Sequence, residues 1–305
     1  MRAKTTQGVI RIGIGGWSYA PWRDTFYPPD VPKARELEYA SRQLTAIEIN
    51  STFYGLQKPS VFARWRDTTP EHFMFSLKAP RFVMQRRTLA DAGESIERFL
   101  TSGVTELADR LGPILWQFAP NRAFDVDDVR GFLQLLPPEA AGVRLRHVIE
   151  ARHESFLQPQ FIELLRQHHV AAVCADSPKY PSFADITSDF IYARLMRSVA
   201  TVDTGYLKPA IEQWKQRVLI WSQGSTPKDL PRVESQPVST VPRDVFLYFI
   251  NGAKERAPAA VRVLIGELSD MRLAAAPPQR TGRTTAASRR KAGRGVDRVR
   301  TKNNR

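Results

Sequence analysis

The chain has 305 residues and a formal net charge of +14, with 42% hydrophobic and 10% aromatic residues. This composition is sufficient for a large core, so it excludes an intrinsically disordered chain. No stretch approaches the roughly 18 consecutive apolar residues of a membrane-spanning helix, and the N-terminus lacks the apolar core of a signal peptide. We therefore expect a folded protein of the cytoplasm with no membrane partner.

Most of the positive charge lies at the C-terminus. Residues 275–305 contain ten Lys or Arg residues against Asp297 alone, a net charge of +9, which leaves +5 for the preceding 274 residues. Large apolar side chains are almost absent from this segment. We therefore expect residues 1–274 to form a single domain and residues 275–305 to be a disordered basic tail. Such a tail binds nucleic acid nonspecifically by neutralising phosphates, which makes nucleic acid a candidate partner.

Stretches with the residue pattern of strands alternate with stretches typical of helices along the chain. The predicted strands, eight in number, span residues 9–15, 46–50, 73–78, 114–118, 146–153, 170–176, 190–195 and 245–251. The predicted helices include residues 33–44, 59–65, 95–111, 125–136, 158–168, 209–222 and 258–273. Too few residues separate the sixth strand from the seventh for an ordinary crossover helix. Cys174 is the only cysteine, and its apolar surroundings predict an inert strand residue.

This order predicts an α/β fold with a parallel sheet, either a (β/α)₈ TIM-barrel-like domain or an open doubly wound sheet. Nearly every strand is apolar until its C-terminal end, where polar residues appear. In a barrel these ends meet at one mouth, where active sites are built. We therefore favour the barrel, with an irregular crossover between strands six and seven.

The segment Ala46–Tyr54 shows the polar pattern most clearly. Ile47 and Ile49 share one face of the strand, and Glu48 lies on the other with Asn50. A carboxylate inside the fold costs several kcal/mol unless its pKa shifts or a partner is supplied. The strand therefore predicts a polar cluster around Glu48.

Polar residues near the ends of the other strands are the remaining members of the predicted site. We expect acids and bases for catalysis in Glu48, Lys78, Glu150 and Asp176. Arginine forks suit carboxylate or phosphate groups, so an anionic ligand is predicted. Substrate contacts are expected from Trp17, Tyr19, Asn50, Tyr54, Gln117, Arg152, His153, Arg194 and Asn251.

The leading hypothesis is an enzyme that acts on a small anionic metabolite, phosphorylated or sugar-derived, by general acid–base catalysis. Glu48 and Glu150 would transfer protons, and Lys78 would act as electrostatic stabiliser or base. Arg152 and Arg194 would hold the anion. The alternatives are a nucleic-acid-binding protein or metal-assisted phosphodiesterase using Glu150, His153 and Asp176, and a metabolite sensor without catalysis. No cofactor is predicted, although Glu150, His153 and Asp176 could bind a divalent metal. Each of these polar residues could also form a structural ion pair.

The chain resembles the YecE-like family, a domain of unknown function (DUF72). The segment Glu48–Tyr54 carries the resemblance most specifically. The other segments that support it, in the same order, are residues 12–19 with Trp22 and 26–28, then 75–80, 111–118, 150–156 and 175–176. The resemblance covers about residues 10–264 and leaves out the basic tail. It implies a TIM-barrel-like fold and an activity that has not been assigned.

Overall fold

The computed structural model describes residues 7–23, 25–234 and 240–274. The expected disordered tail, residues 275–305, lies outside the described residues.

Parallel strands form a closed barrel, so the predicted barrel is confirmed over the open sheet. The strand order around the barrel is β1-β10-β9-β8-β7-β4-β3-β2, and β1 pairs with both β2 and β10. The barrel strands are β1 Ile10–Gly15, β2 Ala46–Ile49, β3 Met74–Lys78, β4 Leu111–Gln117, β7 His147–Glu150, β8 Ala171–Asp176, β9 Phe190–Leu195 and β10 Asp244–Phe249. A short antiparallel hairpin of β5 Glu139–Ala140 and β6 Val143–Arg144 was not predicted.

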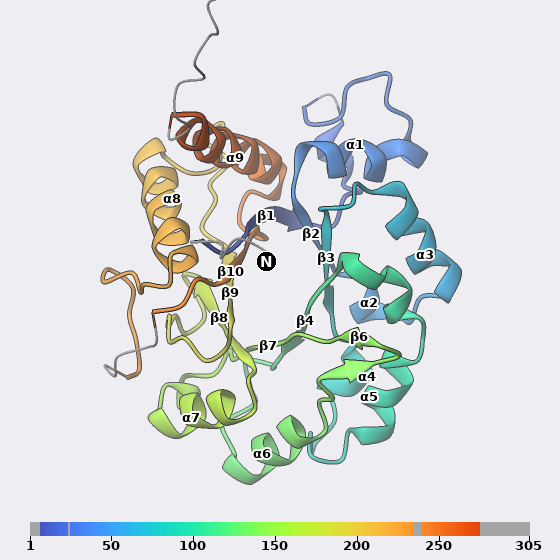
Figure 1. Ribbon diagram of the computed structural model, residues 1–305, viewed down its shortest axis with the longest axis vertical. Coiled ribbons are helices and arrows are strands. Elements are labelled where there is room, and N and C mark those ends of the chain that lie inside the picture. Colours follow the sequence, from blue (N-terminus) through green and yellow to red (C-terminus); the bar gives the residue numbers. More distant parts are fainter. Residues whose placement is uncertain (1–6, 24, 235–239, 275–305) are drawn as a thin grey trace, which may run out of the picture.

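Helices surround the barrel (Figure 1). They are α1 Glu36–Gln43, α2 Ser51–Tyr54, α3 Pro59–Thr68, α4 Arg81–Met84, α5 Gly93–Leu100, α6 Val126–Gln134, α7 Pro159–Gln167, α8 Lys208–Ser222 and α9 Ala257–Ala274. Short 3₁₀ helices occupy Ala20–Trp22, Lys33–Arg35, Val104–Arg110, Glu154–Phe156 and Lys254–Arg256. Asp125 caps α6 as predicted, because its carboxylate accepts hydrogen bonds from the first backbone N–H groups of the helix.

The predicted long helix over residues 95–111 is wrong. Its first part is α5, which ends at Leu100, and a 3₁₀ helix follows from Val104. Gly103 separates the two with a φ of +113°, in the left-handed region that favours glycine. A side chain there would also collide with Pro59, whose Cα lies 2.6 Å from the position of an added Cβ.

The connection between β8 and β9 contains no helix in its described residues, which confirms the irregular crossover. A loop takes the place of a helix and is fastened to the segment before β10. The Asp185 carboxylate accepts hydrogen bonds from the backbone N–H groups of Val233 and Glu234, at 2.7 and 2.9 Å. The Ala184 N–H donates to the carbonyl of Pro231 at 2.8 Å.

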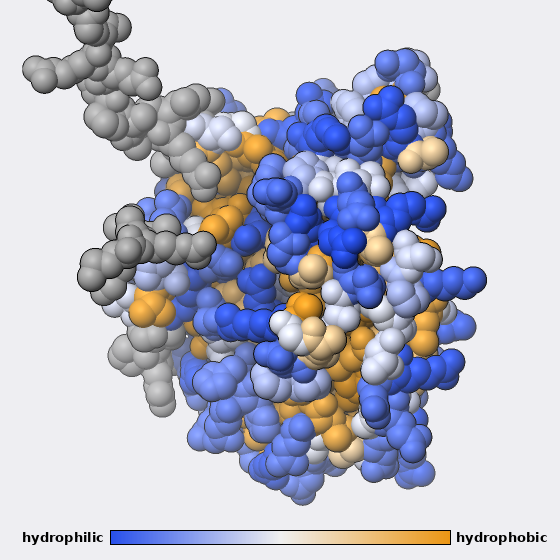
Figure 2. Space-filling view, turned by 45° about the vertical axis from the view of Figure 1, so that its right-hand side comes forward, coloured by the Kyte–Doolittle hydropathy of each residue, from blue (hydrophilic) through white to orange (hydrophobic). Residues whose placement is uncertain are grey.

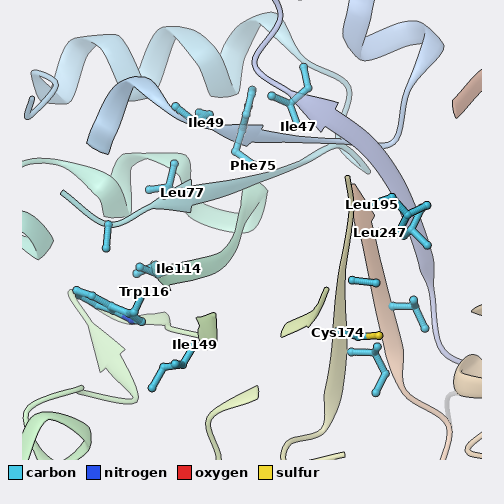
Figure 3. Close-up of a cluster of buried hydrophobic side chains, with 14 of the residues drawn as sticks. Ile47, Ile49, Phe75, Leu77, Ile114, Trp116, Ile149, Cys174, Leu195 and Leu247 are labelled. Atoms are coloured by element: carbon cyan, nitrogen blue, oxygen red, sulfur yellow. The ribbon is translucent and has the colours of Figure 1, made fainter. Parts of the chain in front are cut away.

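Apolar side chains pack on both faces of the strands. One cluster lies between strands and helices and includes Ile47, Ile49 and Cys174 (Figure 3). A second cluster has the opposite strand parity and fills the barrel; it includes Ala46, Val173 and Phe246. On the outside, hydrophilic side chains predominate on the face that Figure 2 shows. Glu48 therefore points into the barrel, as its strand pattern predicts.

Candidate functional site

A buried ion triad crosses the barrel interior near the C-terminal ends of the strands. The Arg194 guanidinium on β9 donates from Nε and Nη2 to the two carboxylate oxygens of Glu48 on β2, both at 3.0 Å. Its Nη1 donates to Oε2 of Glu150 on β7 at 2.7 Å. The three side chains expose between 0% and 2% of their surface. Because β1 and β10 separate β2 from β9 in the barrel, the Glu48–Arg194 pair spans the interior.

Neutral hydrogen-bond donors complete the triad. The Tyr192 hydroxyl donates to Oε2 of Glu48 at 2.8 Å, and the Gln117 amide donates to Oε2 of Glu150. Arg152 adds a donor to Oε1 of Glu150 at 3.3 Å. Every carboxylate oxygen of the two glutamates thus accepts a hydrogen bond, as buried charges require.

The charges in the triad fix its protonation. Burial alone raises the pKa of Glu150, but Arg194, Arg152 and the Gln117 hydrogen bond outweigh it and hold that pKa below its ordinary value. Burial lowers the pKa of Arg194, yet the two glutamates raise it further above its already high value. Glu150 and Arg194 are therefore ionised at neutral pH, and the two carboxylates of the triad face two guanidinium groups, those of Arg194 and Arg152.

Lys78 is the surplus cation of the site. It ends β3 and is half-buried, and its Nζ lies 4.2 Å from the centre of the Phe53 ring on α2. No carboxylate of the described residues pairs with this Nζ. Burial and the charge of Arg194 outweigh Glu48 and Glu150, so the pKa of Lys78 falls from 10.5 to about 8.

Local structure holds Lys78 in place. The Thr52 hydroxyl donates to the Lys78 carbonyl at 2.7 Å and also lies 3.2 Å from the carbonyl of Ile49. These contacts fasten α2, and with it the Phe53 ring, to the ends of β2 and β3. The Lys78 ammonium is therefore presented at the C-terminal mouth of the barrel.

Arg152 is the second cation near the mouth. Its side chain exposes 16% of its surface, and its guanidinium lies 4.1 Å from the centre of the Tyr180 ring. Tyr180 belongs to the loop between β8 and β9. The stacked ring and Glu150 hold the guanidinium from two sides. Donors that remain on Arg152 suit an anionic group of a ligand.

Two predicted catalytic and metal-binding residues lie apart from the triad. Asp176 has the opposite parity to the inward residues of β8, and it pairs with Arg197 at 2.8 Å. Burial raises the pKa of Asp176, although Arg197 opposes the effect. The His153 ring bonds Ser155 at 2.8 Å and caps a 3₁₀ helix. Among the residues that the structure describes, no group of three or more His, Cys, Asp or Glu is arranged to hold a metal ion.

The remaining predicted contact residues surround the mouth without joining the triad. Trp17 packs edge-on against Trp65, with ring centres 5.3 Å apart. Tyr19 lies beneath the Lys254 ammonium, 4.7 Å away. The other three are half-buried Asn50, the exposed side chain of Tyr54, and exposed Asn251.

Sequence reasoning missed the aromatic partners of the site. Tyr192 lies two residues before Arg194 on the same strand, and this period-2 spacing could have identified it. The Tyr248 hydroxyl, in register with Arg194, bonds Ser76, in register with Glu48, at 2.7 Å. Phe53 and Tyr180 carry no sequence signal of this role, because their contacts with Lys78 and Arg152 depend on the folded chain.

Comparison with known proteins identifies the family. The model of a family described as "Protein of unknown function DUF72" matches residues 11–283. The chain belongs to the DUF72 family. This match confirms the YecE-like resemblance and covers all strands that carry the triad.

Two bacterial relatives support the DUF72 assignment. The UPF0759 protein YecE of Escherichia coli K12 is 27% identical over 248 residues, which cover 72% of this chain and 84% of that protein. The UPF0759 protein YunF of Bacillus subtilis strain 168 is 26% identical over 160 residues, which cover 51% of this chain and 55% of that protein.

Solved DUF72 structures share the fold. A DUF72 family protein of Thermotoga maritima matches with a TM-score of 0.65 and 19% identity, covering 86% of this chain and 99% of that chain. A DUF72 family protein of Enterococcus faecalis matches with a TM-score of 0.60 and 16% identity, covering 87% and 99%. Within the described residues of the DUF72 chain, no helix is long and apolar enough to cross a membrane.

Proposed function

We propose that this DUF72 protein is a cytoplasmic enzyme that acts on a small anionic metabolite, phosphorylated or sugar-derived, by general acid–base catalysis at the C-terminal mouth of the barrel. The observation that carries the proposal is Lys78, a surplus cation with a pKa of about 8. A group with this pKa exchanges protons readily near neutral pH. It also attracts an anion to a site whose other charges are balanced.

The triad has a supporting role in this proposal. The carboxylates of Glu48 and Glu150 already accept hydrogen bonds from Arg194, so both are engaged in the ion triad. The pKa of Glu150 is also held below its ordinary value, which makes it a weak base. They therefore position Arg194 and Arg152 and set the field around Lys78. The sequence alone suggests proton transfer by the two glutamates. We assign this role to Lys78 instead.

The proposed chemistry uses both forms of the lysine. Neutral Lys78 accepts a proton from the bound metabolite, and the ammonium returns a proton to it. Arg152 holds the anionic group, and the free capacity of the Gln117 amide orients a neutral polar group. Asn50 lies beside this region, at the N-terminus of α2.

The first experiment is a thermal-shift screen of the full chain against inorganic phosphate, citrate, hexose phosphates and a short oligonucleotide. Ligand at about 100 times its Kd adds roughly 2.7 kcal/mol of stability. We expect a phosphorylated metabolite to stabilise the wild-type protein and Lys228→Met, and to leave Lys78→Met unchanged. Lys228 is exposed and serves as the matched control.

The second experiment tests proton transfer itself. The stabilising metabolite is incubated in D₂O with each protein, and loss of its C–H signals is followed by proton NMR. We expect deuterium exchange or product with the wild-type protein and neither with Lys78→Met. Binding without exchange or product would favour the sensor alternative. A shift with the oligonucleotide alone would favour the nucleic-acid alternative.

A further inference from the structure

A polar cleft of about 650 Å³ lies beside the mouth, between the segment that follows β3 and the segment that follows β4. Its volume is within the range of small-molecule sites, roughly 300–1,000 Å³. The polar residues of its lining include Arg86, Arg87, Thr88, Asn121, Arg122 and Asp128.

Short stretches of chain connect the walls of the cleft to residues of the mouth. Ala119 in its wall follows Gln117 by two residues, so their Cα atoms lie within about 7 Å. The Gln117 amide itself donates to Glu150 of the triad. On the opposite wall, Met84 ends the short helix α4 that begins three residues after Lys78. A ligand of modest length could therefore contact both the mouth and the cleft.

The acidic groups of the cleft are already occupied by structural bonds. The Asp125 carboxylate caps α6. The Asp128 carboxylate accepts from the Ala90 N–H at 2.9 Å and from Arg122 Nη1 at 3.1 Å. The side chain of Arg122 also donates to the carbonyls of Arg86 and Arg87. Arg122 is thus a fixed brace that holds this loop against the start of α6.

The brace leaves two arginines available for a ligand. Arg86 and Arg87 are exposed, and neither makes an ion pair with a carboxylate of the described residues. Arg86 donates one hydrogen bond, to Ser95 at 3.1 Å. Thr88 and Asn121 add neutral donors to the same lining. Two guanidinium groups that no carboxylate of the described residues pairs with, on a backbone held by Arg122, are suited to a phosphate or carboxylate.

We propose that this cleft is a second anion subsite, so that the substrate of the mouth is a small metabolite with an anionic group at each end, such as a sugar bisphosphate. The inference rests on the proposed function, in which Lys78 and Arg152 take the first anionic group. Arg86 and Arg87 take the second, and Arg122 positions them through their carbonyls.

Isothermal titration of the full chain with hexose 1,6-bisphosphate, hexose 6-phosphate and inorganic phosphate tests the proposal. We expect the wild-type protein to bind the bisphosphate at least about tenfold more tightly than the monophosphate, since a second charge-assisted contact is gained. The double variant Arg86→Gln/Arg87→Gln should bring the two affinities within about threefold of each other. Its monophosphate affinity should stay unchanged.

Controls separate this inference from the proposed function. Arg64→Gln changes an exposed arginine on α3 and should match the wild-type protein for every ligand. Equal affinities for monophosphate and bisphosphate, or a bisphosphate preference that survives the double variant, would overturn the second subsite alone. If Lys78→Met binds all ligands like the wild-type protein, the first site is wrong too. Oligonucleotides titrated in the same way give a further test. If their affinity rises with length and the bisphosphate does not bind, the proposal is also overturned.

Discussion

Substituting Lys78 by Met should stabilise the protein while it removes anion binding. The pKa of Lys78 falls from 10.5 to about 8 on folding. At about 1.36 kcal/mol for each pKa unit, the buried ammonium costs about 3 kcal/mol of folding free energy at neutral pH. Met keeps an unbranched apolar stem but loses the contact with the Phe53 ring, worth about 1 kcal/mol. We expect a net gain of about 2 kcal/mol.

The gain should depend on pH in a defined direction. The folded pKa is the lower one, so between about pH 8 and 10.5 the folded chain binds fewer protons than the unfolded chain. The contribution of Lys78 to the free energy of unfolding of the wild-type protein therefore rises with pH across that window. The difference between Lys78→Met and the wild-type protein should be largest below pH 8 and should shrink toward pH 10.5.

Urea unfolding at several pH values, followed by circular dichroism, measures both effects. Lys228→Met, an exposed substitution, should change the free energy of unfolding by less than about 0.5 kcal/mol at every pH. The reasoning is refuted if Lys78→Met lowers the free energy of unfolding at pH 7. It is also refuted if the difference from the wild-type protein stays constant up to pH 10.5.

Three further substitutions or reactions probe the interior. Arg194→Met leaves Glu48 and Glu150 without their shared partner and should cost at least about 3–5 kcal/mol, which denaturant unfolding measures; a loss below 1 kcal/mol contradicts a buried triad. Tyr248→Phe removes the Ser76 hydrogen bond and should cost about 1–3 kcal/mol by the same assay. An unchanged denaturant midpoint would mean that this hydrogen bond is exposed to solvent and not buried. Burial raises the pKa of Cys174 to about 12, so iodoacetamide at pH 8 should modify it only after denaturation; rapid labelling of the folded chain, seen by mass spectrometry, would contradict this.

The sequence was sufficient for the barrel because its signals are local. Alternation in each strand separates the outward Ile47 and Ile49 from the inward Glu48, and the same parity places Arg194 inside. A buried acid at one strand end then requires a buried base at another. The cluster could therefore be predicted, although the partner of each acid could not.

Two predicted site residues lie apart from the triad, one because of its parity at a strand end and one because it belongs to a loop. Asp176 follows the inward Ala175, so it faces away from the barrel interior and pairs with Arg197. His153 bonds its own loop, for which a list of strand-end residues gives no indication. Whether Lys78 and Arg152 share one anion site likewise depends on distances that only the folded structure gives. The low pKa of Lys78 follows from its burial and from its position near Arg194, and sequence spacing cannot supply either.

The most direct test of the account is the pKa of the Lys78 amine, measured by NMR titration of the full chain with ¹⁵N-labelled lysine side chains and assigned with Lys78→Met. The account predicts one lysine that titrates at about pH 8, absent from the variant, with a pKa that rises when the stabilising anionic metabolite is added. A Lys78 pKa near 10.5 that does not respond to any anion would contradict the proposed catalytic and binding role.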